Sequence, residues 1–274
     1  MTVSRRSDLA GAGRVVVKVG SSSISGENVD KIGPIVEALA AAHARGTEVV
    51  LVSSGAIATG MPYLTLDERP TDLATQQAAA AVGQNVLIYR YQNALRPFGI
   101  VAGQVLLTAG DLDHPTPRSN ARRAMERLLG LRILPIVNEN DTVATHEIRF
   151  GDNDRLAALV AQLIGADALV LLSDIGNLYT RPPGEPGATP IDRVEHDDDL
   201  SGYEFGSVVV NSVGTGGAAT KASAARLATA AGIGVLVTSA DLVAEALRGD
   251  GIGTWFAPDP DVTPSVGTTP VRTV

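Results

Sequence analysis

The apolar residues of this chain gather in short runs separated by longer, alanine-rich segments. Six runs are rich in Val, Ile and Leu, at residues 15–19, 49–52, 100–107, 133–137, 168–172 and 234–237. None of them alternates polar and apolar positions, which is typical of strands buried on both faces. We therefore expect six strands, each covered on both sides.

The segments between these runs have the length and composition of helices. Five of them are predicted to be helical, at residues 29–45, 72–96, 116–130, 154–164 and 220–231. Four of the five are followed by a glycine, which is a common signal for the end of a helix. Strands that alternate with crossover helices form a parallel sheet between two helical layers. The pattern predicts an α/β fold, a three-layer αβα sandwich with a mostly parallel central sheet.

The alternation occupies one continuous stretch, so we expect a single domain at residues 14–257. Residues 1–13 form an N-terminal extension, and residues 258–274 show no periodicity, which predicts a flexible C-terminal tail. Residues 179–207 include Pro182, Pro183 and Pro186, and we expect them to form a long excursion from the sheet. The acidic run at 197–199 is interpreted as a solvated face rather than a metal site.

Composition excludes several classes of protein. A chain of 274 residues that is 45% hydrophobic can bury a sizeable core, which argues against disorder. The absence of cysteine excludes disulfide frameworks, zinc fingers, iron–sulfur sites and thiol nucleophiles. The net charge of −8 disfavours binding to nucleic acid or to acidic membranes. With neither a secretory signal nor an apolar run of about 20 residues, a cytoplasmic protein is expected.

Two lysines lie beside glycines at places where a phosphate could bind. Ligands of doubly wound sheets collect at the carboxyl ends of the strands. Lys18 lies in an otherwise apolar run and either reaches solvent or is neutralised by an anion. Gly20 and the serines after it can present backbone N–H groups to a phosphate. Lys221 follows a glycine-rich segment that opens a helix, where free N–H groups and the helix dipole favour anions.

Polar clusters follow other strands. Residues 138–141 read Asn-Glu-Asn-Asp and offer amide donors and carboxylate acceptors for a small zwitterion, although an Asx turn would also explain them. Residues 152–154 read Asp-Asn-Asp, which exceeds what one helix cap uses. Ser173 and Asp174 could meet a nucleotide, whereas Ser53 and Ser54 alone favour a helix cap.

Two known motifs do not fit these segments, and a third fits only loosely. The serines at 53 and 54 do not fit the G-x-S-x-G elbow of hydrolases. The glycine-rich segment is not a Walker A loop, because Thr220 stands where that motif needs glycine. Gly214, Gly216 and Ala219 do satisfy a loose dinucleotide-binding spacing, but that fingerprint normally opens the first strand–helix unit. A nicotinamide-dependent dehydrogenase therefore stays a distant alternative.

Two separated lysines and neighbouring acid–amide clusters are typical of a phosphoryl-transfer site. Such transfer needs positioning and neutralisation of negative charge, with little covalent chemistry from the protein. One lysine on each side of the γ-phosphate would supply that neutralisation. A carboxylate such as Asp154 could hold both ammonium groups in place.

Five segments, in order, resemble the amino acid kinase family. They are VKVGSS at 17–22, VSSGAI at 52–57, VNEND at 137–141, FGDND at 150–154 and GTGGAATK at 214–221. The resemblance covers residues 14–257. It implies the carbamate kinase-like fold and an ATP-dependent phosphorylation of the γ-carboxylate of L-glutamate. The product would be L-glutamyl 5-phosphate, in the first step of proline biosynthesis.

The resemblance also implies roles for individual residues. Lys18 and Lys221 would stabilise the transferred phosphoryl group, and Asp154 would orient them. Glutamate would be held by Ser54, Asn138, Asp141, Asp152 and Asn153. ATP would be bound by Lys18, Gly20, Ser173, Asp174, Thr215, Gly216, Gly217, Ala218, Ala219, Thr220 and Lys221. Mg²⁺ would sit on the phosphates, with no protein ligand assigned.

Further expectations concern partners. The resemblance implies feedback inhibition by L-proline, a homodimer or homotetramer, and glutamyl phosphate reductase as a partner that takes the product. Many family members continue into a C-terminal PUA domain, which this chain is expected to lack. Chemistry alone also allows acetylglutamate, aspartate, carbamate or a nucleoside monophosphate as the acceptor. A non-catalytic sensor of amino acid or nucleotide is another alternative, but two lysines at one phosphate argue against it.

Overall fold

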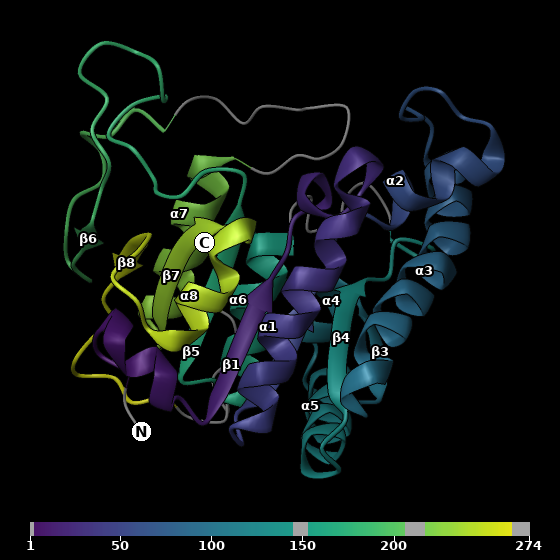
Figure 1. The fold of residues 1–274 in the computed structure, drawn as a ribbon, viewed down its shortest axis with the longest axis horizontal. Coiled ribbons are helices and arrows are strands. Elements are labelled where there is room, and N and C mark those ends of the chain that lie inside the picture. Colours follow the sequence, from purple (N-terminus) through teal and green to yellow (C-terminus); the bar gives the residue numbers. More distant parts are fainter. Residues whose placement is uncertain (1–2, 145–152, 206–216, 265–274) are drawn as a thin grey trace.

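The sheet organises the molecule. A computed structural model describes residues 3–144, 153–205 and 217–264. Its described strands are β1 (Arg14–Lys18), β2 (Glu48–Val52), β3 (Ala102–Leu107), β4 (Leu134–Glu139), β5 (Ala168–Ser173), β6 (Arg193–Val194), β7 (Gly234–Ser239) and β8 (Thr254–Phe256). They form one sheet in the order β3-β4-β2-β1-β5-β7-β8-β6. Figure 1 shows β1 near the middle, with β3 at one end and β6 and β8 at the other.

The six predicted runs are the six longer strands, β1 to β5 and β7. These six pair in parallel throughout, and β8 alone among the described strands pairs antiparallel to its neighbour β7. From β1 the sheet extends in both directions, to β2 and to β5, so the chain order reverses around β1. In open α/β sheets the crevice at such a reversal is where ligands bind.

Helices cover both faces of the sheet, as predicted. The described helices are α1 (Ile32–Ala44), α2 (Ala56–Gly60), α3 (Leu73–Leu95), α4 (Ala109–Asp113), α5 (Pro115–Gly130), α6 (Asn153–Ile164), α7 (Ala218–Thr229) and α8 (Val243–Arg248). Short 3₁₀ segments are η1 (Arg6–Gly11), η2 (Ser21–Ser23), η3 (Gly26–Lys31), η4 (Met61–Leu64), η5 (Arg96–Phe98) and η6 (Ala240–Leu242). None of the described helices is long and apolar enough to cross a membrane.

The core lies in two layers, one on each side of the sheet. Successive residues of a strand face opposite sides. In β1, Val15 and Val17 pack into a cluster with α1, α3 and α8, whereas Val16 packs into a second cluster with α5, α6 and α7. This alternation inside an all-apolar strand gives the three-layer sandwich, and the predicted fold class is confirmed.

Three expectations need correction. The run at 100–107 was predicted to be covered on both faces, but β3 is an edge strand in which Gln104 is exposed. Asn138 and Glu139 were predicted to follow the fourth strand, but they are the last residues of β4, because pairing with β3 continues through them. The predicted excursion at 179–207 returns to the sheet, where β6 pairs in parallel with β8.

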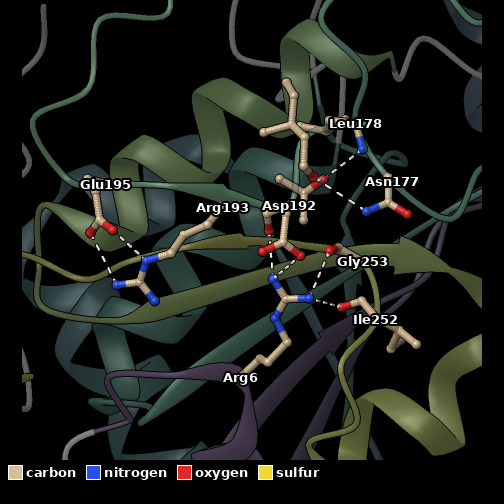
Figure 2. Close-up of polar contacts among 10 residues, drawn as sticks. Arg6, Asn177, Leu178, Asp192, Arg193, Glu195, Ile252 and Gly253 are labelled. Carbon is tan, nitrogen blue, oxygen red and sulfur yellow. Dashed lines mark hydrogen bonds and ion pairs between the residues drawn. The ribbon is translucent and has the colours of Figure 1, made fainter. Parts of the chain in front are cut away.

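The N-terminal segment packs against the end of the sheet (Figure 2). The Arg6 guanidinium donates to Asp192 O at 2.7 Å and to Asp192 Oδ1 at 2.8 Å. It also donates to the carbonyl oxygens of Ile252 and Gly253, at 3.2 and 3.3 Å. Beside it, Leu178 N donates to Thr254 Oγ1 at 2.9 Å. The bonds of Arg6 connect the N-terminal segment to the residues that precede β6 and β8.

Helices α2 and α3 approach each other unusually closely. A Cβ added at Gly60 would lie 1.9 Å from Ala79 O, and one added at Gly83 would lie 1.8 Å from Ala56 O. Only glycine permits such an approach of two backbones. The contact fixes α2, and with it the segment at 53–55, against the long helix α3.

Candidate active site

Three charged side chains meet at the carboxyl end of the central strands. Lys18 is the last residue of β1, Asp154 lies in the first turn of α6, and Lys221 lies in the first turn of α7. Lys18 Nζ is 2.5 Å from Asp154 Oδ1, and Lys221 Nζ is 3.0 Å from Asp154 Oδ2. One carboxylate thus holds two ammonium groups that are 203 positions apart in the chain.

This cluster is buried. Asp154 is 0% exposed, Lys18 2% and Lys221 6%. Charges are costly to bury unless they are paired and hydrogen-bonded. One carboxylate lies between two ammonium groups here, and an anion that reached them would be attracted by both lysines. Because water is largely excluded here, that attraction is stronger than at an exposed surface.

The first turns of α6 and α7 add to this preference. Free N–H groups at a helix N-terminus favour negative charge. At the start of α7, Gly217 N donates to Thr220 Oγ1 at 3.0 Å, and this hydroxyl donates to Gly217 O at 2.8 Å. Thr220 Oγ1 also lies 3.3 Å from Asp154 Oδ2. The residue that breaks the Walker A pattern therefore caps the helix and contacts the carboxylate.

The loop after β1 lies against the lysines. A Cβ at Gly20 would be 3.9 Å from Lys18 Nζ. Ser22 Oγ donates to Asp174 Oδ1 at 2.9 Å, and Ser23 Oγ lies 3.4 Å from the same oxygen. Asp174 follows β5, so it ties the loop of one central strand to the end of its neighbour.

A second group, of amide and hydroxyl side chains, lies at the ends of β2 and β4. Asn153 Nδ2 donates to Ser53 O at 2.6 Å and to Asn138 Oδ1 at 2.8 Å. Asn138 Oδ1 also accepts from Glu139 N at 2.9 Å. Both amides are buried, at 2% exposure for Asn138 and 7% for Asn153. The first turn of α6 therefore carries both Asp154, toward the lysines, and Asn153, toward the amide group.

Helix α3 contributes two more members that were not predicted. Asn138 Nδ2 donates to Gln84 Oε1 at 2.9 Å, and the Tyr91 hydroxyl is 3.0 Å from Ser53 Oγ. Burial raises the pKa of the Tyr91 phenol, so this hydroxyl stays protonated. Gln84 and Tyr91 are seven residues apart and therefore share one helix face. This polar spacing in an alanine-rich helix was the available signal in the sequence.

Most of the predicted site residues lie at this edge of the sheet. Gly217, Ala218 and Ala219 form the start of α7, Ser173 ends β5, Ser54 follows β2, and Asp141 lies two residues beyond β4. Gly55, next to Ser54, has φ +89°, and a Cβ there would lie 3.4 Å from Ser21. The segments after β1 and β2 therefore touch. Asp152, Thr215 and Gly216 lie outside the described residues.

A cavity of about 620 Å³ lies on the other side of α7. Its lining includes Ala219, Ser223 and Arg226 of the helix, together with Leu200 and Phe205. At 3.6 residues per turn, these α7 positions face away from Lys221. The Arg226 guanidinium donates to the carbonyl oxygens of Glu195, His196 and Asp198, which fixes one wall. This cavity is separate from the cluster of Lys18, Asp154 and Lys221.

A protein-built metal cage is absent from the part of the chain that the structure describes. No group of three or more histidine, aspartate or glutamate side chains there could hold a metal ion. The buried carboxylate of Asp154 already contacts two lysines, one on each oxygen.

A known protein family matches most of this chain. The profile of the Amino acid kinase family matches residues 13–239. The chain belongs to the amino acid kinase family. This confirms the resemblance carried by the five sequence segments, all of which lie within the matched residues.

Relatives within the family are highly similar. Glutamate 5-kinase of Clavibacter sepedonicus is 70% identical over 94% of this chain and 99% of its own length. Glutamate 5-kinase of Salinispora arenicola is 54% identical, over 93% of this chain and 70% of its own length. Among solved structures, carbamate kinase from Giardia lamblia bound to AMP-PNP has a TM-score of 0.67 at 17% identity, covering 91% of this chain and all of that one. The last comparison shows the shared fold.

Proposed function

We propose that this chain transfers the γ-phosphoryl group of ATP to the γ-carboxylate of L-glutamate, which makes it a glutamate 5-kinase. The observation that carries the proposal is the buried contact of Lys18 and Lys221 with Asp154. The relatives named glutamate 5-kinase, at 69 and 70% identity over almost their whole length, support glutamate as the acceptor.

The lysines act on the phosphoryl group. An oxygen of the glutamate γ-carboxylate attacks the γ-phosphorus, the bond from that phosphorus to the bridging oxygen of ADP breaks, and ADP leaves with the electron pair. Negative charge moves from the equatorial oxygens toward the leaving oxygen during this step. Lys18 and Lys221, fixed by Asp154, stabilise that charge without reorganising, which is the main contribution of preorganised sites.

No general base is needed. A glutamate side chain has an ordinary pKa of about 4.3, so the γ-carboxylate is already an ionised nucleophile at neutral pH. The described part of the site accordingly brings lysines, amides and hydroxyls together, with no histidine among the contacts of Lys18, Asp154 and Lys221. The enzyme works by placing two anions next to each other, and its positive charge offsets their repulsion.

The amide group holds the acceptor. Amide N–H groups donate to carboxylates, and amide or carboxylate oxygens accept from the α-ammonium group. Asn138, Asn153, Ser54 and Asp141, with Asp152 outside the described residues, are the glutamate ligands of this proposal. Since Asn153 and Asp154 are adjacent in α6, the acceptor and the charge cluster are held by one rigid helix turn.

Mg²⁺ belongs to the nucleotide in this proposal. Magnesium is usually bound through substrate phosphates and a few carboxylates, and it keeps several waters. No group of three or more acidic or histidine side chains among the described residues could hold the ion, and the phosphate oxygens of ATP would be its ligands. When bound, it neutralises phosphate charge.

Three partners complete the proposal. L-Proline acts as a feedback inhibitor, the chain forms a homodimer or homotetramer, and glutamyl phosphate reductase takes the product in the cytoplasm. An acyl phosphate is a reactive mixed anhydride, so a reductase that consumes it promptly limits its loss to water.

Trapping of the product tests the proposed function. Purified protein is given ATP, Mg²⁺ and hydroxylamine, with L-glutamate, acetylglutamate, aspartate, carbamate or UMP as acceptor, and ADP and hydroxamate are measured. The proposal predicts ADP release and hydroxamate with L-glutamate alone. Turnover with a different acid would assign another acceptor on this fold, and nucleotide binding without any turnover would indicate a sensor.

A further inference from the structure

We propose that Gln84 and Tyr91 of α3 are positioning residues for the acceptor. Neither is adjacent to the reacting atoms; each acts through a residue of the amide group, Gln84 through Asn138 and Tyr91 through Ser53. The inference rests on the proposed function, because it names what sets the geometry of that same site.

The hydrogen-bond pattern leaves a single orientation for the amides. Glu139 N can only donate, so the atom of Asn138 that faces it is the oxygen. Asn153 faces two acceptors, Asn138 Oδ1 and Ser53 O, so it presents its nitrogen to both. The nitrogen of Asn138 then faces Gln84, and the Gln84 atom that accepts its hydrogen bond is Oε1. Gln84 thus adds a third hydrogen bond that holds the Asn138 amide in this one orientation.

Tyr91 contacts the other end of this hydrogen-bond network, at Ser53. Ser53 O accepts from Asn153, and Ser53 N donates to Val137 O at 2.8 Å. The side chain of Ser53 lies 3.0 Å from the Tyr91 hydroxyl, and both residues are fully buried. Burying the Tyr91 hydroxyl costs free energy unless it is hydrogen-bonded, and Ser53 is its partner. This contact fixes Ser53, which follows β2 and whose carbonyl accepts from Asn153.

The residues of α3 near the site indicate that Gln84 does more than fill space. The helix buries Ala79, Ala80, Gly83 and Leu87 on the side that contacts α2 and the sheet, and apolar residues would suffice there. Gln84 instead accepts a hydrogen bond from Asn138 with its amide oxygen. Within the described residues its side chain makes no other hydrogen bond. Loss of this bond leaves a buried N–H of Asn138 without its acceptor. An unsatisfied buried donor destabilises a protein more than replacing both partners with apolar groups does.

Gln84→Met is the direct test, since it keeps the length of the side chain and removes the acceptor. Gln92→Met is the matched control on the same helix: Gln92 accepts from Ala102 N at 2.9 Å and donates to Ile100 O at 3.3 Å, away from the amide group. We expect Gln84→Met to raise KM for L-glutamate about tenfold, with KM for ATP within twofold of wild type. Gln92→Met should lower Tm and leave both KM values unchanged.

A double-variant cycle checks that Gln84 acts through Asn138. In an Asn138→Ala background, Gln84→Met should no longer change KM for L-glutamate, because the bond is already absent. Tyr91→Phe, which keeps the ring and removes the hydroxyl, should raise KM for L-glutamate by a smaller factor than Gln84→Met. Equal tenfold effects of Gln84→Met in both backgrounds would overturn the mechanism through Asn138.

Two results reject the inference outright. One is an unchanged KM for L-glutamate in a folded Gln84→Met protein; the other is an equal rise of both KM values. Failure of the proposed function is distinguishable, because the wild-type protein itself would then form no hydroxamate with glutamate.

Discussion

The two halves of the site are built from different interactions. On the side of β1, α6 and α7, one buried carboxylate holds two lysines. On the side of β2, β4 and α3, neutral amides and hydroxyls hold one another, from Gln84 through Asn138 and Asn153 to Ser53 and Tyr91. The neighbours Asn153 and Asp154 connect the two halves.

The difference matches the two tasks of the reaction. Phosphoryl transfer develops negative charge, and fixed positive charge lowers the energy of that charge, so in the proposed function the charged half would govern turnover. Recognition of a small zwitterion needs donors and acceptors at set positions, and a site built for hydrogen bonds rejects ligands that leave them unpaired. In the proposed function, the neutral half would therefore govern which acid is accepted.

Loss of the carboxylate should have the largest effect. Asp154→Asn removes the carboxylate that contacts both buried ammonium groups, and removing one partner of a buried ion pair costs about 3–5 kcal/mol of stability. Urea unfolding measures this loss, with the substitution Asp67→Asn at an exposed position as the control. A change below about 1 kcal/mol would show that the cluster is not the buried network described here.

Loss of either lysine should act on turnover. Lys18→Ala and Lys221→Ala are each expected to lower kcat by about 10²–10³, the effect of removing one charge-stabilising donor. Steady-state kinetics and circular dichroism measure rate and fold together. Near-normal kcat in either folded variant would contradict the role of the charged half.

A change on the acceptor side should act on binding. Asp141→Ala is expected to raise KM for L-glutamate about tenfold or more, with little change in KM for ATP, because one ligand of a zwitterion is removed. Kinetics with each substrate varied in turn provide the measurement. Equal changes in both KM values would place Asp141 outside the acceptor site.

The smallest effect concerns the helix that carries Gln84 and Tyr91. Asp72 caps α3 by accepting from Thr75 N at 2.9 Å, and this bond lowers the pKa of the Asp72 carboxyl. A depressed pKa contributes stability above the ordinary aspartate value of about 3.9, and the contribution is lost as pH falls through the folded value. Asp72→Ala should therefore lower Tm at pH 7, and the difference should vanish in acid. A difference independent of pH would argue against the cap.

The longer elements of the fold could be predicted from the sequence, because buried parallel strands and crossover helices leave uninterrupted runs. The elements that were missed are short or depend on a distant partner. β8 has three residues and exists through pairing with β7, and α2 has five and is fixed by the close approach of Gly60 and Gly83 to α3. Such contacts leave no local pattern.

The site was predictable to the extent that strand ends converge. Lys18, Asp154 and Lys221 stand out because charged residues interrupt or follow apolar runs, and a parallel sheet brings such ends together. Gln84 and Tyr91 were missed because they lie inside a helix, far from any strand end. Their partners depend on how α3 is placed against β2 and β4, which local sequence does not specify.

Parallel kinetics of Lys221→Ala and Gln84→Met would test the central claim most directly, with kcat and both KM values determined for each. The account predicts a loss of kcat of about 10²–10³ for the lysine variant, and a rise in KM for L-glutamate of about tenfold for the glutamine variant. If both folded variants changed the same parameter by the same factor, the division into a charged half for turnover and a neutral half for the acceptor would be contradicted.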